Sequence, residues 1–249
     1  MVQSARPPQG FQLLEQNPRY AIYFVPAEDT NLYRFGASIL GYDCYAGEDA
    51  PFDGDFEIEP RVWAAMTEEP RRYGFHATLK APFYLSPSCT EAQLSNALEN
   101  FAALAHTAPT FKPAIRLLKD FIAIVPRRRQ SAIDKLAADC VTLFDAYRAP
   151  MSPQERARRV AAGLNAGQIG HLDRWGYPYL FEDFRFHMTL TGRISVERRD
   201  VVMAALEKLF ARSCGDTPIA IDQLTLLRQD SPQSRFRVIS HAKIGSSIG

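Results

Sequence analysis

A pentapeptide of the form Phe-His-x-Thr-Leu occurs twice in this chain of 249 residues. The copies span residues 75–79 and 186–190, which places them 111 positions apart. Each copy is followed by a capped helix with apolar residues at helical spacing, and then by a strand-like run rich in Ile and Leu, over 115–125 and 219–227. The repetition predicts an internal duplication with two lobes, each built around one motif strand.

Alternation along each motif predicts a histidine and a threonine on the same face of a strand, because side chains two positions apart share a face. In the first copy the polar face is predicted to carry His76, Thr78 and Lys80, while the opposite face is apolar and anchors the strand. In the second copy the predicted polar face carries Arg185, His187, Thr189, Thr191 and Arg193. Each strand then presents an imidazole beside a hydroxyl.

Two interpretations of these strands compete. A single His-x-Thr strand is most often half-exposed, with its polar side in contact with water. The chain has only five histidines, however, and two of them occupy equivalent positions of the repeat. Contact with water requires polar residues there, but it does not require the same pair twice. We therefore favour a functional site over a solvated face.

The chemistry of such a site follows from the two residue types. If a pseudo-twofold axis brings the motifs together across a cleft, two imidazoles face each other with two hydroxyls between them. Histidine titrates near neutral pH, so one ring can be the base while the other is the acid. This arrangement suits in-line displacement at phosphorus, and the sequence leaves open which histidine is the base. The predicted catalytic residues are His76, Thr78, His187 and Thr189.

Four further residues near the motifs are candidates for substrate binding: Lys80, Arg185, Tyr73 and Arg193. Cations suit a phosphoryl group, whose oxygens gather charge in the transition state. Lys80 is equally consistent with a solvated edge lysine that discourages aggregation. Arg185 has the same two interpretations and lies two residues from His187. A ligand role and ordinary packing are equally open for Tyr73, whereas Tyr23 on the first strand is typical of a core residue.

Neither a metal nor a cofactor is expected. The four cysteines are scattered, without a C-x-x-C pair. The other histidines lack the spacing and the neighbouring carboxylates of a metal site. Two histidines can move both protons of the reaction without a metal. A metal-dependent hydrolase is the alternative that sensitivity to a chelator would reveal.

The charge of the chain is nearly balanced. It has 29 Lys+Arg against 28 Asp+Glu, a formal net charge of +1, and so gives no overall field that attracts nucleic acid or an anionic membrane. No apolar run approaches the roughly 20 residues that span a bilayer, and the N-terminus lacks the apolar stretch of a secretory signal. We expect a cytoplasmic protein whose partner is a small phosphorylated substrate.

At the repeated motif the sequence resembles the 2H phosphoesterase superfamily, which is defined by two His-x-Thr/Ser motifs. More narrowly, it is similar to the phosphonate-metabolism-associated branch, the DUF1045-type proteins. The strings that carry the closer match are RYAIYFVP at 19–26, RRYGFHATLKAPF at 71–83, RAP at 148–150 and WGYPYLFEDFRFHMTLTGR at 175–193. The similarity covers roughly residues 19–230, and both histidines and both threonines of the motif are kept.

The resemblance implies hydrolysis or formation of a phosphodiester, commonly a cyclic one, without a cofactor. For this branch it implies a cyclic ribose phosphate or a related intermediate linked to carbon–phosphorus bond cleavage. The superfamily also includes RNA-processing members, so nucleotide-like substrates stay open. The leading hypothesis is therefore a metal-independent phosphodiesterase that hydrolyses a cyclic phosphate ester.

Basic clusters support a second hypothesis. The densest ones, Arg127–Arg129 and the group Arg156, Arg158 and Arg159, suit contact with RNA or with a phosphorylated metabolite. A non-catalytic binding protein that uses the same cleft is the alternative function. Such clusters are usually solvated faces, and the balanced net charge speaks against binding of nucleic acid.

The pattern of elements predicts the fold class. Strands alternate with helices, which is typical of mixed α/β or α+β layer folds. With the resemblance, the expectation is an α+β, bilobal, pseudo-twofold fold of antiparallel sheets with flanking helices. We expect a tail at 1–18, a single bilobal domain at 19–243 with motif strands near 75–80 and 184–191, and a tail at 244–249.

Overall fold

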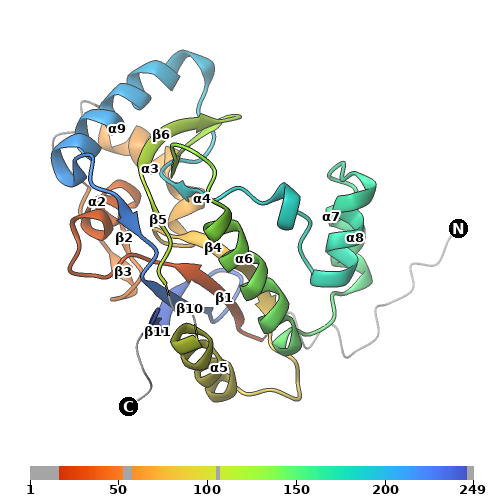
Figure 1. Ribbon diagram of the computed structural model, residues 1–249. Coiled ribbons are helices and arrows are strands. Elements are labelled where there is room, and N and C mark those ends of the chain that lie inside the picture. The colour runs from red at the N-terminus through yellow and green to blue at the C-terminus, as the bar shows by residue number, and fades with distance from the viewer. Residues whose placement is uncertain (1–16, 53–57, 105–106, 246–249) are drawn as a thin grey trace, which may run out of the picture.

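The two motif segments lie next to each other at the centre of one antiparallel sheet. The computed structural model describes residues 17–52, 58–104 and 107–245. Its main sheet has seven strands in the order β11-β10-β1-β4-β8-β7-β6 (Figure 1). These strands are β1 (Arg19–Phe24), β4 (Ala77–Tyr84), β6 (Pro113–Leu118), β7 (Phe121–Pro126), β8 (Met188–Thr189), β10 (Gln223–Gln229) and β11 (Arg237–Lys243). Two small ribbons pair β2 (Tyr42–Asp43) with β3 (Glu48–Asp49) and β5 (Thr110–Phe111) with β9 (Ile219–Ala220).

Local signals in the sequence set the helix ends. The Thr30 side chain accepts a hydrogen bond from the Tyr33 amide at the start of α2, and Gly41 ends that helix at φ +70°. Ser152 caps α7 in the same way, with Pro153 in its first turn. The helices are α2 (Asn31–Leu40), α3 (Pro60–Met66), α4 (Glu68–Arg71), α5 (Glu91–Leu104), α6 (Ser131–Phe144), α7 (Pro153–Val160), α8 (Ala166–Trp175) and α9 (Arg199–Cys214). The 3₁₀ turns are η1 (Asp145–Tyr147), η2 (Phe181–Asp183) and η3 (Val196–Arg198).

The duplicated halves exchange strands. The hairpin β6–β7 follows the first motif in the chain but pairs with β8, which carries the second motif. The strands β10 and β11 follow the second motif but extend the sheet beyond β1, on the side of the first motif. Every strand pair is antiparallel, which confirms the predicted α+β fold with antiparallel sheet. The two lobes share one sheet and do not face each other as separate sheets.

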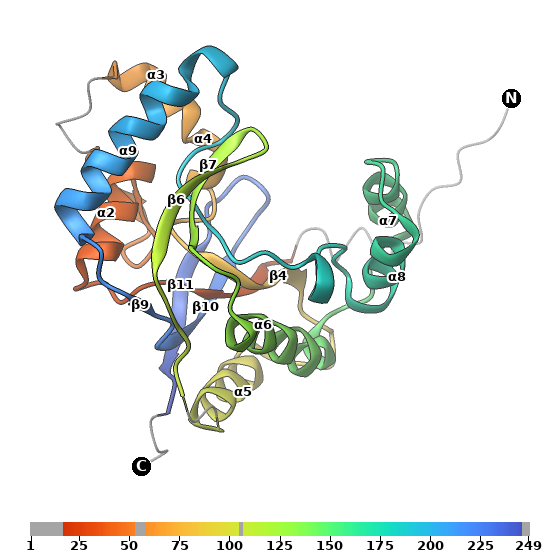
Figure 2. The same cartoon turned by 45° about the horizontal axis from the view of Figure 1, so that its top comes forward.

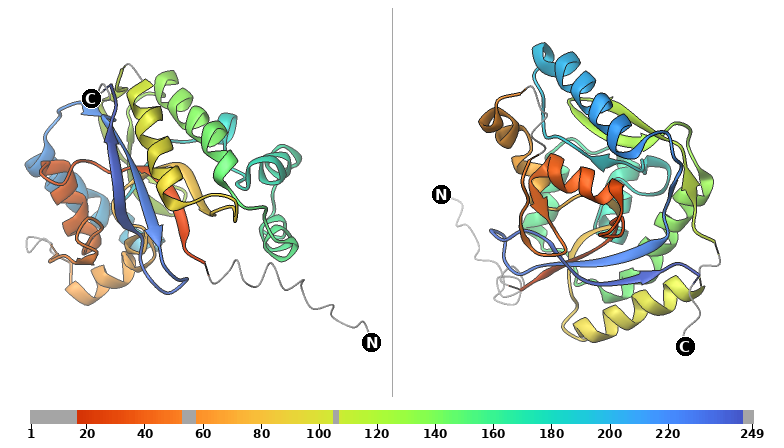
Figure 3. Two further views of the ribbon diagram at one scale, coloured as in Figure 1. Left: turned by 90° about the horizontal axis from the view of Figure 1, so that it is seen from below. Right: turned by 90° about the vertical axis from the view of Figure 1, so that its left-hand side faces the viewer.

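Helices cover the side of the sheet on which the larger core cluster lies. Helix α5 packs against β10 and β11, α6 packs against β4, and α9 packs against β6 and α2 (Figures 2 and 3). The core cluster there includes Ile22 and Phe24 of β1, Ala77 of β4 and Met188 of β8. The α7–α8 pair stands beside the sheet (Figure 2). None of the helices in the described part of the chain has the length and apolar character needed to cross a lipid bilayer.

Some predicted elements differ from the structure. The second motif strand is predicted over 184–191, but only Met188–Thr189 is paired as β8, and residues 184–187 and 190–191 on either side of it are not in a strand. Helix α8, over Ala166–Trp175, was not anticipated. Residues 1–16 and 246–249 of the expected tails lie outside the described residues.

Phe75, the first residue of the first motif, packs directly on Gly36 of α2. A Cβ added to Gly36 would lie 2.0 Å from the Phe75 ring, closer than any real contact. We expect Gly36→Ala to lower the free energy of unfolding, because overpacking costs about 1–3 kcal/mol while the gain in helix propensity is about 1 kcal/mol. Urea unfolding of the variant measures the loss as a lower midpoint.

Gly170 of α8 is the matched control for this substitution. It also lies inside a helix, and nothing stands within 4 Å of an added Cβ there. Gly170→Ala should therefore raise the free energy of unfolding by about 0.5–1 kcal/mol, which is the propensity gain alone. If both substitutions changed the free energy of unfolding in the same direction, the close packing of Phe75 on Gly36 would be contradicted.

Candidate active site

The register of the two central strands brings the four motif side chains together. Ala77 of β4 is paired with Met188 of β8. In an antiparallel pair, the same register places His76 opposite Thr189 and Thr78 opposite His187. Because Ala77 and Met188 point into the core, these four neighbours point to the other face. The two histidines are then diagonal neighbours, roughly 7–8 Å apart at the backbone.

The same hydrogen bond orients both imidazoles. Nδ1 of His76 lies 2.9 Å from the Gly74 carbonyl, and Nδ1 of His187 lies 2.7 Å from the Arg185 carbonyl. A carbonyl can only accept, so Nδ1 carries the proton in each ring and Nε2 of the neutral ring keeps its lone pair. Nε2 of His76 lies 3.2 Å from the Thr78 hydroxyl. Gly74 permits this turn through its φ of +74°.

Both imidazoles are held neutral near pH 7. Burial lowers the pKa of His76 to about 4, against the opposing effect of the Gly74 carbonyl, and the nearby His187 lowers it further. Burial also lowers the pKa of His187, and the Arg185 carbonyl opposes this shift. A neutral ring with a free lone pair is ready to take a proton. A bound anion would raise the pKa of each ring and let one of them become an acid.

Aromatic side chains line the His76 side of the site. The Tyr23 ring stacks on the imidazole of His76, with centroids 3.8 Å apart and planes at 21°. Tyr73 lies farther out, with its centroid 6.1 Å from His76. Tyr23 is buried as the sequence predicted, but its contact with His76 was missed because the pairing of β1 with β4 is not encoded near either residue.

Lys80 does not lie with the motif residues, contrary to the alternation pattern. Tyr23 of β1 pairs with Thr78, and the next residue back, Ile22, pairs with Lys80, so that β4 holds one extra residue there. Such a bulge reverses the side to which the following side chains point. Lys80 therefore points away from the histidines and is only 3% exposed. Its Nζ donates to the Val141 carbonyl and lies 3.3 Å from Asp145 Oδ1.

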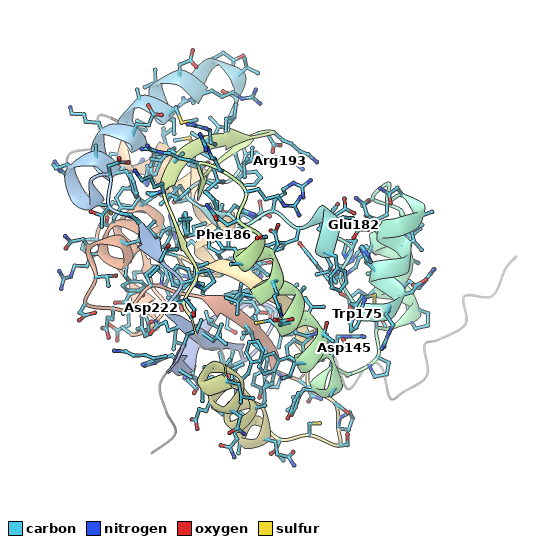
Figure 4. All side chains as sticks on the ribbon, viewed as in Figure 1. Asp145, Trp175, Glu182, Phe186, Arg193 and Asp222 are labelled. Atoms are coloured by element: carbon cyan, nitrogen blue, oxygen red, sulfur yellow. The ribbon has the colours of Figure 1, made fainter. Side chains whose placement is uncertain are left out.

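The polar face predicted for the second motif is also interrupted. The Arg185 guanidinium bends back and donates hydrogen bonds to the carbonyls of Glu182 and Phe184. Its contact with His187 is made by its backbone carbonyl and not by the guanidinium. Thr191 is fully buried and accepts a hydrogen bond from the Ile122 amide. Arg193 is 87% exposed and pairs with Asp120, near the β6–β7 turn (Figure 4). The alternation fails here because β8 ends at Thr189.

Tyr73 and several arginines line a cavity of about 990 Å³. Arg19 and Tyr84 form a cross-strand pair that, by the register of β1, points to the same side of the sheet as Tyr23 and the motif histidines. Arg19 binds Gln229 and Arg72 binds the Pro232 carbonyl, and neither pairs with a carboxylate of the described chain. Arg158 and Arg159 of its lining belong to a basic cluster evident in the sequence, but the cavity itself could not be predicted because its walls come from distant segments. The lining includes Arg19, Arg72, Arg148, Arg158 and Arg159.

The basic clusters noted in the sequence are largely paired with acids. Arg159 lies 2.7 Å from Glu155, and Arg156 lies 2.6 Å from Asp173. Arg127 pairs with Asp216. These local pairs reduce the positive field that a nucleic-acid backbone would meet. Within residues 17–52, 58–104 and 107–245, no group of three or more His, Cys, Asp or Glu side chains is placed to hold a metal ion.

Comparison with known sequences matches one family. The family described as "Protein of unknown function (DUF1045)" matches residues 78–237. A protein of Janthinobacterium sp. (strain Marseille) named ribose 1,5-bisphosphate phosphokinase PhnN is 39% identical over 225 residues, which are 89% of this chain and 50% of that protein. A protein of the same name from Laribacter hongkongensis (strain HLHK9) is 33% identical over 181 residues, 71% of this chain and 40% of that one. The chain thus spans about half the length of these curated relatives or less.

The solved structures that this chain matches have distant sequences and TM-scores below 0.5. A conserved protein of unknown function from Agrobacterium tumefaciens aligns over 95% of this chain and 94% of its own, with a TM-score of 0.43 and 12% identity. The structure of Escherichia coli LigT complexed with NADP+ aligns over 93% of this chain and 99% of its own, with a TM-score of 0.40 and 12% identity.

Proposed function

The chain belongs to the DUF1045 family, and from this membership and the paired His-x-Thr geometry we propose that it is a metal-independent phosphodiesterase acting on a small cyclic phosphate ester. The observation that supports the proposal most directly is the pairing of Ala77 with Met188, because this register puts the two imidazoles and the two hydroxyls on one face of adjacent strands. The resemblance of the motifs to those of the 2H phosphoesterases supports the same reaction class.

The proposed reaction is an in-line attack of water on phosphorus. One imidazole accepts a proton from the water at Nε2 while the new O–P bond forms. The other imidazole, protonated once the anionic diester binds, gives its proton to the leaving oxygen as the ester P–O bond breaks. The hydroxyls of Thr78 and Thr189 donate hydrogen bonds to the non-bridging oxygens, whose charge grows in the transition state. The product is a ring-opened phosphate monoester.

The arginine-lined cavity supports a substrate with a second anionic group. Arg19 and Arg72 are free of carboxylate partners in the described chain and lie on the side of the cavity near Tyr73. The relatives named for a ribose 1,5-bisphosphate reaction handle a sugar that carries two phosphates. We therefore extend the proposed substrate to a ribose cyclic phosphate with a further phosphate group. Kinase activity is not proposed, because the sequence has no G-x-x-x-x-G-K-[S/T] phosphate-binding loop.

The test is a turnover screen of the purified chain against ribose 1,2-cyclic and nucleoside 2′,3′-cyclic phosphates, each with and without a further phosphate, followed by phosphorus NMR. We expect ring opening that persists in EDTA and is fastest for a ribose compound with the further phosphate. Arg19→Gln should raise KM for that compound by about 10–100-fold, since a charged hydrogen bond contributes about 1.5–3 kcal/mol, with little effect on the compound lacking it.

Arg127→Gln is the control for general loss of positive charge. Arg127 is exposed, pairs with Asp216 and is not part of the cavity, so KM should stay within about twofold of the parent. Binding of cyclic phosphates or oligonucleotides without any ring opening would contradict the proposal and favour the alternative of a binding protein. Complete loss of turnover in EDTA would instead favour a metal-dependent hydrolase.

A further inference from the structure

The two halves of the site differ at one position of the sheet. Thr78 of the first motif pairs with Tyr23 on β1, whereas Thr189 of the second motif pairs with Ala123 on β7. Strands β1 and β7 are the outer neighbours of the two motif strands, so Tyr23 and Ala123 occupy equivalent positions of the duplication. The site is therefore symmetric in its motif residues and asymmetric in the side chains beside them.

Tyr23 holds the imidazole of His76 from one side. Its ring stacks on the imidazole at 3.8 Å and is itself only 1% exposed, so that it keeps water from one face of the imidazole. The hydrogen bond from Nδ1 of His76 to the Gly74 carbonyl also holds the orientation of the imidazole. The aromatic contact of His187 is looser, since the ring centroids of Phe121 and His187 are 5.7 Å apart and their planes lie at 56°.

No negative charge in the described chain faces His76. From β1 it meets Tyr23, and from the segment before β4 it meets Tyr73. From the segment before β8 it faces the imidazole of His187, and along its own chain it contacts the neutral Gly74 carbonyl and Thr78 hydroxyl. Burial raises the pKa of Tyr23 well above its ordinary value, so its hydroxyl stays neutral as well. A protonated His76 would have no counter-ion, and the neutral ring is favoured.

We infer that Tyr23 is a positioning residue that holds His76 as the general base, so that His187 is the general acid. The division of roles rests on the proposed phosphodiesterase function. Nε2 of His76 accepts the proton of the attacking water as the O–P bond forms. Nε2–H of His187, protonated when the anionic diester binds, transfers its proton to the leaving oxygen as the P–O bond breaks. The proton on His76 then returns to solvent and His187 takes up a proton with the next substrate.

Leaving-group dependence tests the division of roles. A nitrophenolate leaves without protonation, so the general acid is dispensable for a 4-nitrophenyl phosphodiester but the base is still needed. We expect His187→Ala to lower kcat/KM by less than about 10-fold on the nitrophenyl diester and by about 10²–10⁴-fold on an alkyl diester. His76→Ala should lower kcat/KM strongly on both. The reverse pattern would overturn the assignment.

Titration of His76 by NMR in the substrate-free protein tests the role of Tyr23. In Tyr23→Ala the midpoint of His76 should rise by one unit or more from about 4 toward the ordinary value near 6.5, and the acidic limb of kcat/KM should move with it. Tyr23→Phe keeps the stacked ring, so both readings should match the parent within about 0.3 units. Phe121→Ala removes the ring that contacts His187, so it should move the midpoint of His187 and leave that of His76.

Tyr23→Leu keeps apolar volume without a stacked ring. If Tyr23→Ala does not fold, the His76 midpoint should rise in Tyr23→Leu in the same way. If the titration midpoint of His76 did not move in the folded variant, the role of Tyr23 would be overturned. The role would also be overturned if the basic limb of the kcat/KM profile moved and the acidic limb did not. A parent protein that opens no phosphodiester contradicts the proposed function. The substrate-free titration separates that failure from a failure of Tyr23.

Discussion

Replacing either motif histidine by alanine is expected to lower kcat/KM for a cyclic phosphate by about 10²–10⁴-fold, which is the usual contribution of one positioned proton-transfer group. His76→Ala removes the Nε2 that faces Thr78, and His187→Ala removes the corresponding imidazole directly before β8. The double variant should be only slightly slower than the worse single variant, because the two groups act in one step and their effects do not add. Steady-state rates on an alkyl cyclic phosphate measure these losses.

His171→Ala provides the control. His171 is also half-buried, but it contacts the Pro178 carbonyl and Glu182 beside α8 and lies outside the motifs. Its removal should change kcat/KM by less than about twofold, as expected for a site away from the chemistry. Circular dichroism of each variant shows that the fold is kept. If the double variant His76→Ala/His187→Ala kept full turnover, the acid–base pair would have to be abandoned.

A large loss of stability is expected from Asp145→Ala. The Asp145 carboxylate receives Lys80 at 3.3 Å and Arg148 at 2.7 Å, with 13% of its side chain exposed. Burial tends to raise the pKa of Asp145, but these two cations outweigh it and hold the pKa below its usual range. Without the carboxylate, Lys80 keeps the Val141 carbonyl but is a buried charge with no ionic partner, and breaking a buried ion pair costs about 3–5 kcal/mol. Urea unfolding at pH 7 measures the change.

The penalty should shrink as the pH rises. Burial already lowers the pKa of Lys80 to about 8 in the folded protein, and loss of Asp145 lowers it further. The unfolded chain keeps an ordinary lysine pKa near 10.4, so it binds more protons than the folded variant in the range between the two values. The parent gains stability by the same titration above about pH 8, so the stability of the variant relative to the parent should increase with pH only up to about pH 8 and stay constant above it.

The surface pair Lys135–Asp139 of α6 gives a matched control. Its atoms lie 2.6 Å apart, but the side chains are 75% and 44% exposed. Asp139→Ala should therefore cost less than about 1 kcal/mol. Equal losses of unfolding free energy in Asp145→Ala and Asp139→Ala would contradict the burial assigned to Lys80.

Lys80→Met should keep kcat/KM within about twofold, because the Lys80 side chain points to the helix side of the sheet.

Features written in a few neighbouring residues could be predicted well. The cap at Thr30, the stop at Gly41 and the start at Ser152 are each set by side-chain and backbone contacts within one turn. The pairing of His76 and Thr78 on one face follows from the strand period. The expectation for Lys80 failed two residues later, because the bulge is set by β1, more than fifty positions earlier. Arg193 failed because β8 ends before it.

The amino-acid sequence by itself determined that two copies of one His-x-Thr segment exist, that each has a polar and an apolar face, and that an acid–base pair at phosphorus is the chemistry they suit. These are properties of short stretches of chain, governed by the period of a strand and the titration of imidazole. Only the tertiary structure decided that the copies are adjacent strands of one sheet, that Tyr23 covers one imidazole while Ala123 stands in the equivalent place, and that Lys80 points away. Those features arise from pairing between distant segments, and the free energy of such pairing depends on the whole sheet and not on any local pattern.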